Sequence, residues 1–184
     1  MKLTPTAIAG AMTVEIAPFL DHRGLFARTF CADTFAAHGL CDRFVNANTS
    51  FNPAAGTLRG LHLQTAPYGE AKLVRATRGR VFDVAVDLRP ASPTYRAWVG
   101  VELDAARRNA LFIPEGCAHG FLTLEPDCEV FYLVSAGYAP DHAQTYRWDD
   151  PTFGIAWPHA PVSISHRDAT AGDYCPQAQP EPRP

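Results

Sequence analysis

The stretch GTLRGLHLQTAP places reactive side chains along one side of a predicted strand. Alternation in a strand puts Leu61 and Leu63 on one face, and Gly60, His62 and Gln64 on the other. Imidazole titrates near neutral pH, so His62 is suited to accept a proton and to release it again. A lone histidine in a strand is more often a structural group, so this interpretation needs partners elsewhere in the chain.

Such partners lie nearby in sequence and in one later segment. Arg59 and Lys72 lie close to His62 in sequence, and IPEGCAHGF supplies His119 directly after a predicted tight turn, where a barrel mouth would expose it. His62, Glu70 and His119 are a conceivable set of ligands for a divalent transition metal. Their spacing suits a metal poorly, and we therefore expect neither a bound metal nor another cofactor.

Short strands are predicted to position these residues. The segment RVFDVAVDLR has a clear period of two, with Asp83 and Asp87 on one face and Phe82 and Leu88 on the other. KLVRATRGRVFDV and NALFIPEGCAHGFLTLE each read as strand, turn and strand, and CEVFYLVSAGY is a further apolar strand. Many short strands separated by turns predict an all-β fold, a jelly-roll barrel or sandwich with a few short helices.

One helix is predicted at DTFAAHG, with Asp33 as its N-cap and Gly39 at its C-terminal end. The chain has 184 residues, of which 47% are hydrophobic, which is enough for one well-buried core. We expect a single domain over residues 1–170. The proline-rich segment 171–184 has little to bury, and we expect it to be disordered.

The charge and the cysteine content limit the possible functions further. The net charge of −3 argues against a nucleic-acid or anionic-membrane surface. Five cysteines without a CxxC pair cannot all pair within the chain, so reduced thiols in the cytoplasm are expected. Pro5 and Glu15 interrupt the early apolar run, which predicts neither a signal peptide nor a membrane span.

Two resemblances sharpen this interpretation. Pro114, Gly116 and His119 fit the second half of the cupin pattern, whereas Gln64 stands where its first half has a histidine. DHRGLFARTF, NANTSFNPAAGTLRGLHLQ, VDLRPASPTY, IPEGCAHGF, VFYLVSAGYAP, RWDDPTFGIAWP and ISHRD resemble successive blocks of the dTDP-4-dehydrorhamnose 3,5-epimerase family. The resemblance covers roughly residues 1–170. It implies a metal-independent cupin isomerase acting on nucleotide-linked 4-keto sugars.

The resemblance also implies roles for five residues. The base would be His62 of RGLH, oriented by Asp168 of SHRD. The acid would be the strand tyrosine Tyr132, Lys72 would lie near the sugar oxygens, and His119 would be a second histidine in the pocket. Removal of a proton beside a ketone, stabilisation of the enolate and protonation from the other face together invert the carbon.

The resemblance assigns the nucleotide contacts as well. Arg23 and Arg59 match positions that contact the diphosphate, for which guanidinium groups are suited. Phe26 matches an aromatic residue that stacks on the base, and Asn48 matches a polar contact near it. The remaining expected substrate contacts are Arg28, Asn46, Gln64, Glu70, Tyr138 and Arg167.

The chain departs from the family pattern near the expected nucleotide site. Arg28 replaces a usual glutamate, Asn46 and Glu70 replace usual glutamines, and Ala143 replaces a usual glutamate. These changes leave the base open between thymidine and an alternative such as cytidine. They also leave the sugar open, and the number of carbons inverted depends on how the sugar lies relative to the acid.

The leading hypothesis is an isomerase that epimerises C3, C5 or both in a nucleotide-diphosphate-linked 4-keto-6-deoxy sugar. The alternatives are a mono-epimerase for a CDP-linked or other sugar and a metal-dependent cupin enzyme. Intact His62, Asp168 and Tyr132 argue against a non-catalytic sugar-binding relative. The resemblance implies a homodimer that exchanges N-terminal strands, and the segment LTPTAIAGAMTVEIAPF is strand-like as this requires. No nucleic-acid or membrane partner is expected.

Overall fold

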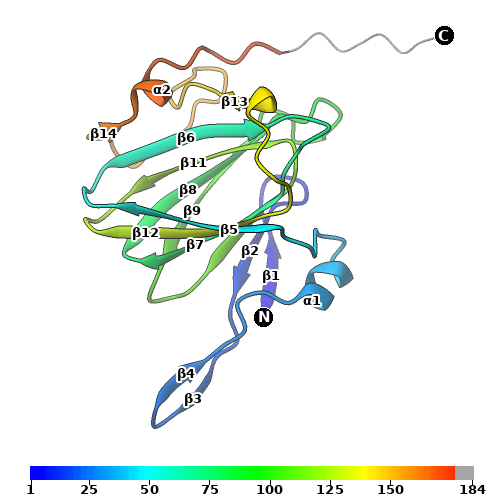
Figure 1. Cartoon of the computed structure of the whole chain (residues 1–184), viewed down its shortest axis with the longest axis vertical. Helices are drawn as coiled ribbons and strands as arrows, with labels where there is room; N and C mark the ends of the chain where they lie inside the picture. The colour runs from blue at the N-terminus through cyan, green and yellow to red at the C-terminus, as the bar shows by residue number, and fades with distance from the viewer. Residues whose placement is uncertain (177–184) are drawn as a thin grey trace, which may run out of the picture.

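Two β-sheets face each other in residues 1–176, the part of the chain that this computed structural model describes (Figure 1). The first sheet has the strand order β1-β2-β10-β7-β12-β5 and comprises β1 (Lys2–Pro5), β2 (Met12–Glu15), β10 (Ala110–Ile113), β7 (Lys72–Arg78), β12 (Cys128–Val134) and β5 (Asn46–Asn52). The second sheet has the order β13-β6-β11-β8-β9 and comprises β13 (Ala143–Thr145), β6 (Thr57–Gln64), β11 (Cys117–Thr123), β8 (Arg80–Asp87) and β9 (Trp98–Asp104). The prediction of an all-β fold is confirmed.

Both segments predicted as strand, turn and strand have this form, but their strands do not pair with each other. Gly79, with φ of 69°, separates β7 from β8, and 114–116 separate β10 from β11. In each case the turn carries the chain from the first sheet to the second. Alternation along a strand identifies its two faces, but it does not say which strand lies beside it.

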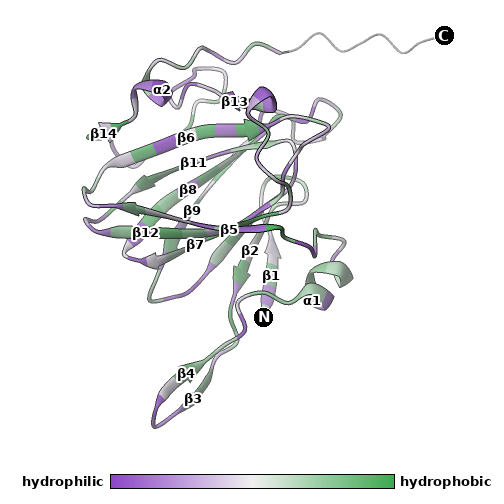
Figure 2. Ribbon diagram, viewed as in Figure 1, coloured by the Kyte–Doolittle hydropathy of each residue, from purple (hydrophilic) through white to green (hydrophobic). Residues whose placement is uncertain are grey.

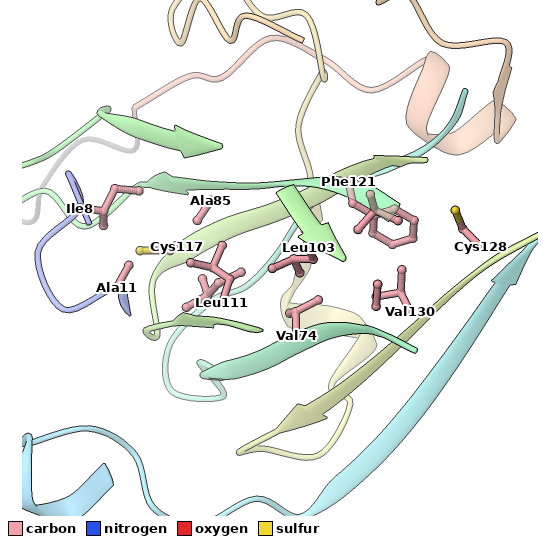
Figure 3. Close-up of a cluster of buried hydrophobic side chains, with 13 residues drawn as sticks. Ile8, Ala11, Val74, Ala85, Leu103, Leu111, Cys117, Phe121, Cys128 and Val130 are labelled. Atoms are coloured by element: carbon pink, nitrogen blue, oxygen red, sulfur yellow. The ribbon is translucent and has the colours of Figure 1, made fainter. Parts of the chain in front are cut away.

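The space between the sheets holds the largest apolar cluster (Figure 3). Val74 and Leu111 enter it from the first sheet, and Ala85 and Phe121 enter it from the second. On β8 the alternate residues Val84 and Val86 face outward into a second cluster. Burial of both faces explains why β8 is apolar along most of its length.

The C-terminal segment covers the outer face of the second sheet. Phe153, Trp157 and Tyr174 pack against that face, and the Tyr174 hydroxyl lies 2.8 Å from the Tyr95 hydroxyl. The packed domain therefore reaches at least Tyr174, beyond the boundary predicted at residue 170. The disorder predicted for 177–184 concerns residues outside the described part of the chain.

Three short helical segments complete the described chain. They are α1 (Ala32–Ala37), η1 (Pro140–His142) and α2 (His166–Ala169). The predicted start of α1 was wrong, because Cys31 is the N-cap. Asp33 instead lies in the first turn, where a carboxylate favours the positive end of the helix dipole. Buried Phe35 packs α1 against the first sheet. No helix within residues 1–176 is long and apolar enough to cross a membrane.

A hairpin of β3 (Phe19–Asp21) and β4 (Gly24–Phe26) projects away from the two sheets (Figure 1). Figure 2 colours much of it as hydrophobic. Phe19, Leu20 and Phe26 are 76%, 77% and 73% exposed. Several large apolar side chains on one projecting element are typical of a surface that binds another protein.

Candidate active site

The candidate active site is a hollow between the two sheets. It has two adjoining parts of about 310 and 350 Å³, and His62, Lys72 and Tyr132 line both. His62 comes from β6 in the second sheet, whereas Lys72 and Tyr132 come from β7 and β12 in the first. The histidine and the tyrosine therefore stand on opposite walls of one cavity.

His62 is held by Asp168 at one ring nitrogen. The distance between His62 Nε2 and Asp168 Oδ1 is 2.8 Å, within the expected hydrogen-bond range. The His62 side chain is 41% exposed and that of Asp168 only 5%. The carboxylate thus lies behind the imidazole, which remains accessible from the cavity.

Two further contacts hold Asp168 in place. The backbone N–H of Gly60 donates to Asp168 Oδ2 at 3.2 Å. The Ser165 hydroxyl caps α2 by accepting from the Asp168 N–H at 3.1 Å. Burial raises the pKa of Asp168, but the hydrogen bonds from His62 and Gly60 outweigh it, so the pKa of this carboxyl is lowered.

The short strand β14 (Ser163–Ile164) and a glycine contact bring these elements together. β14 pairs in parallel with the start of β6 and so places α2 beside His62. Gly60 has φ of 120°, and a Cβ atom there would lie 2.5 Å from the Cα of Gly120 on β11. The close approach of the two glycines lets β6 and β11 carry His62 and His119 side by side.

On the opposite wall, Tyr132 and Lys72 lie with Glu70. Burial and then the Glu70 carboxylate raise the pKa of Tyr132, while Arg59 opposes this. The phenol is thereby kept protonated and able to donate a proton. Lys72 is buried, and its ammonium lies 3.1 Å from Glu70 Oε1, which compensates a charge that would otherwise be costly to bury.

A second histidine–carboxylate pair lies deeper in the cavity. His119 Nε2 is 2.8 Å from Asp83 Oδ1, and Asp83 is fully buried on β8. Sequence reasoning missed Asp83 as a site residue. The signal that could have found it was an acidic side chain on the face of β8 opposite Phe82. This signal is ambiguous, because Asp87 lies on the same face and instead accepts hydrogen bonds from Arg89 in a structural loop.

Most of the predicted substrate contacts line this cavity. They are Asn46, Asn48, Arg59, Gln64, Glu70, His119, Tyr138 and Arg167. Gln64 differs from the prediction in one respect, since its carboxamide is hydrogen-bonded to backbone groups of two loops. Arg59 and Arg167 add guanidinium groups, which are suited to contact phosphate oxygens, to the lining of the cavity.

Three predicted nucleotide contacts lie elsewhere in the described structure. Arg23 pairs with Asp21 at the tip of the projecting hairpin, and Phe26 is 73% exposed there. Arg28 lies beside Cys31 in a separate shallow hollow. A single copy of residues 1–176 therefore does not bring Arg23, Phe26 and Arg28 to the cavity of His62.

The side chains of the cavity suit acid–base chemistry. Within residues 1–176, no three histidine, cysteine, aspartate or glutamate side chains form a group that would hold a metal ion. Glu70, one of the three conceivable ligands, is paired with Lys72 instead. An imidazole backed by a carboxylate, a cation and a protonated phenol can remove a proton, stabilise an oxyanion and return a proton.

Comparisons with known proteins agree with this geometry. The family model described as dTDP-4-dehydrorhamnose 3,5-epimerase matches residues 5–174. An enzyme of that name from Methanothermobacter thermautotrophicus is 47% identical over 171 residues, which cover 91% of this chain and 91% of the relative.

Two solved structures with the same name share the fold. The protein from Elizabethkingia anophelis superimposes with a TM-score of 0.91 at 34% identity, covering 95% of this chain and 96% of that one. The protein from Bacillus anthracis, with TDP and PPi bound, superimposes with a TM-score of 0.89 at 36% identity, covering 94% and 99%. The prediction of a cupin jelly roll is thus confirmed, and the chain belongs to the dTDP-4-dehydrorhamnose 3,5-epimerase family.

Proposed function

We propose that this protein is an isomerase that epimerises C3 and C5 of a dTDP-linked 4-keto-6-deoxy sugar. The observation that carries the proposal is the pair of His62, backed by Asp168, and Tyr132 on opposite walls of one cavity. The name shared by the relatives and the TDP bound in one of them support the substrate class.

The reaction begins at His62. Because Asp168 accepts from Nε2, the second ring nitrogen, Nδ1, is left as the proton acceptor. Nδ1 removes a proton from the carbon beside the ketone, and the electron pair of the C–H bond moves into an enolate. Asp168 stabilises the imidazolium that forms.

The reaction is completed from the opposite wall. The Lys72 ammonium stabilises the negative charge on the enolate oxygen. The Tyr132 hydroxyl then donates its proton to the other face of the carbon, which restores the ketone and inverts the centre. Exchange with water returns a proton to Tyr132 and removes one from His62, so the enzyme regains its starting state.

The experiment offers the purified protein dTDP-, CDP-, UDP- and GDP-linked 4-keto-6-deoxy sugars in deuterium oxide and follows them by NMR. We expect deuterium at C3 and C5 and inversion at both carbons with the dTDP sugar. Inversion at one carbon alone would identify a mono-epimerase. Preference for the CDP sugar would show that the nucleotide base of the substrate is cytosine rather than thymine. Turnover that required added metal would instead favour a metal-dependent cupin enzyme.

We further infer a homodimer in which the β3–β4 hairpin packs on a second copy of this chain. Its exposed Phe19, Leu20 and Phe26 support this, because a second copy would cover them. The arrangement would also explain why Arg23 and Phe26 lie away from the cavity of their own chain. On the partner, both residues would be available to a bound nucleotide.

A cytoplasmic location completes the proposal. All five cysteines are free rather than disulfide-bonded, which suits a reducing compartment. Attachment of a fluorescent protein to either end of the chain, followed by fractionation of the cells, would test this location.

A further inference from the structure

Gln64 lines the cavity, but its amide group is occupied by the protein itself. Its Nε2 donates to the backbone oxygen of Tyr68 at 2.5 Å and to that of Gly137 at 2.9 Å. Its Oε1 accepts from the N–H of Ala139 at 2.8 Å. Both N–H groups of the amide are therefore used, and Gln64 is only 3% exposed.

Two of these hydrogen bonds, those with Gly137 and Ala139, connect the two walls of the cavity, whereas Tyr68 lies in the loop that follows β6 itself. Gln64 ends β6, the second-sheet strand that carries His62. Gly137 and Ala139 lie in the segment that follows β12, the first-sheet strand that carries Tyr132. The amide thus holds the strand of the proposed base to the chain that leaves the strand of the proposed acid.

A second connection lies at the other end of β6. Arg59 Nε donates to Asn52 Oδ1 at 2.8 Å, which joins β6 to β5 of the first sheet. His62 lies between the two connections, two residues from Gln64 and three from Arg59. Arg59 is also an expected phosphate contact. Gln64 is therefore the connection whose polar atoms all bond within the protein.

We propose that Gln64 is a positioning residue that sets the gap between His62 and Tyr132 and so couples enolisation to inversion. The proposal rests on the function proposed above for these two residues. Enolisation requires His62 to reach the C–H bond and the Lys72 ammonium to lie near the enolate oxygen. Inversion also requires Tyr132 to reach the opposite face of the same carbon, so a change in the gap affects inversion more.

The magnitude of this effect follows from the distance dependence of proton transfer. A donor must approach to about 2.6–3.2 Å from its acceptor, and a misplacement of about 1 Å costs on the order of 10²-fold in rate. Loss of the Gln64 connection should therefore slow inversion by roughly 10-fold to 10²-fold. His62 remains oriented by Asp168, so exchange of deuterium into unchanged substrate should fall much less.

The test compares wild type with Gln64→Glu and Gln64→Met in deuterium oxide. Glutamate keeps the size of the side chain but presents an oxygen to the carbonyl groups of Tyr68 and Gly137, whereas methionine removes every hydrogen bond. For each protein, NMR measures deuterium in substrate of unchanged configuration and the amount of inverted product. Both variants should raise the ratio of exchange to inversion about ten-fold or more.

The matched control is Gln144→Met on the neighbouring strand β13, which lines the same cavity. Within residues 1–176, the Gln144 carboxamide makes no hydrogen bond, so this variant should leave the ratio unchanged. Amide hydrogen exchange gives a second readout, because the N–H of Ala139 should lose protection in Gln64→Met, which removes its acceptor. This second readout does not depend on catalysis.

Two results would overturn the proposal. Exchange and inversion that fall in equal proportion in the Gln64 variants would show that the residue supports the fold alone. An unchanged ratio with normal rates would show that the gap between His62 and Tyr132 does not depend on Gln64. Wild-type protein that neither exchanges nor inverts any substrate would instead contradict the proposed function, which separates the two failures.

Discussion

Asp168 contributes both to the proposed chemistry of His62 and to the stability of the fold. Its two oxygens accept from two different donors, His62 Nε2 and the Gly60 N–H. An asparagine at this position offers one acceptor oxygen and one NH₂ group, so one of the two donors must lose its partner. Asp168→Asn therefore removes one hydrogen bond while it nearly preserves the shape of the side chain.

The lowered pKa of Asp168 predicts how its contribution varies with pH. Above the unfolded-state pKa of about 3.9, the contribution of the carboxylate to stability is fully present. It is lost as the pH falls through the lower folded-state pKa. The difference in free energy of unfolding between wild type and Asp168→Asn should therefore shrink as the pH falls below about pH 4.

Urea unfolding of both proteins across this pH range measures that difference. Asp149, which is paired with Arg147 at the surface, offers a control with a carboxyl pKa that is also lowered. Asp149→Asn should cost much less stability than Asp168→Asn at neutral pH, because exposed ion pairs contribute little. A difference for Asp168→Asn that grows as the pH falls below about pH 4 would contradict the assignment.

The sequence predicted which residues belong to the candidate site better than it predicted which residues they contact. His62, Lys72 and Tyr132 lie in recognisable blocks, and the structure places all three around one cavity. Asp83 was missed because its pairing with His119 depends on the register between β8 and β11. The hydrogen bonds of Gln64 to Gly137 and Ala139 could not be predicted for a similar reason, since these two partners are distant in sequence.

The contact between β6 and β11 depends on a pair of glycines. Ala at position 60 would need φ near 120° and would place its Cβ 2.5 Å from the Cα of Gly120. Gly154 provides a control, because it also has a positive φ of 58° but nothing lies within 4 Å of a Cβ there. Gly154→Ala should cost about 1 kcal/mol from backbone conformation alone.

Gly60→Ala should cost about 2 kcal/mol more than Gly154→Ala, because backbone atoms must also move apart. Chemical denaturation of both variants measures the difference. Equal costs would mean that β6 and β11 separate without penalty and that their close contact does not hold His62 in place.

The strands themselves follow from local sequence, whereas their arrangement does not. Alternation identified β8 and its two faces, and Gly79 identified the turn before it. Nothing in that alternation indicates that β7 and β8 belong to different sheets. Tyr174 was assigned to the tail because the surrounding sequence is rich in proline, yet its ring packs against Phe153 at 5.4 Å between centroids.

We expect the protein to be a dimer in which the second copy covers the projecting β3–β4 hairpin. Light scattering at micromolar concentration should give about twice the chain mass of 20.1 kDa. Phe26→Asp should lower this mass, because a charge at the interface is costly to bury. Val162→Asp changes a residue that is 79% exposed on a different segment and should leave the mass unchanged. A wild-type mass near 20.1 kDa would contradict the dimer.

The central claim is that His62 and Tyr132 act from opposite faces of the sugar. Its most direct test is Tyr132→Phe in deuterium oxide, with His62→Ala as the comparison. His62→Ala should abolish both deuterium incorporation and inversion, since proton removal cannot begin. In Tyr132→Phe, His62 should still exchange deuterium on its own face, while inversion falls on the order of 10²–10⁴-fold. Inversion at the wild-type rate in Tyr132→Phe would contradict the account and direct attention to Tyr138, which lines the same cavity.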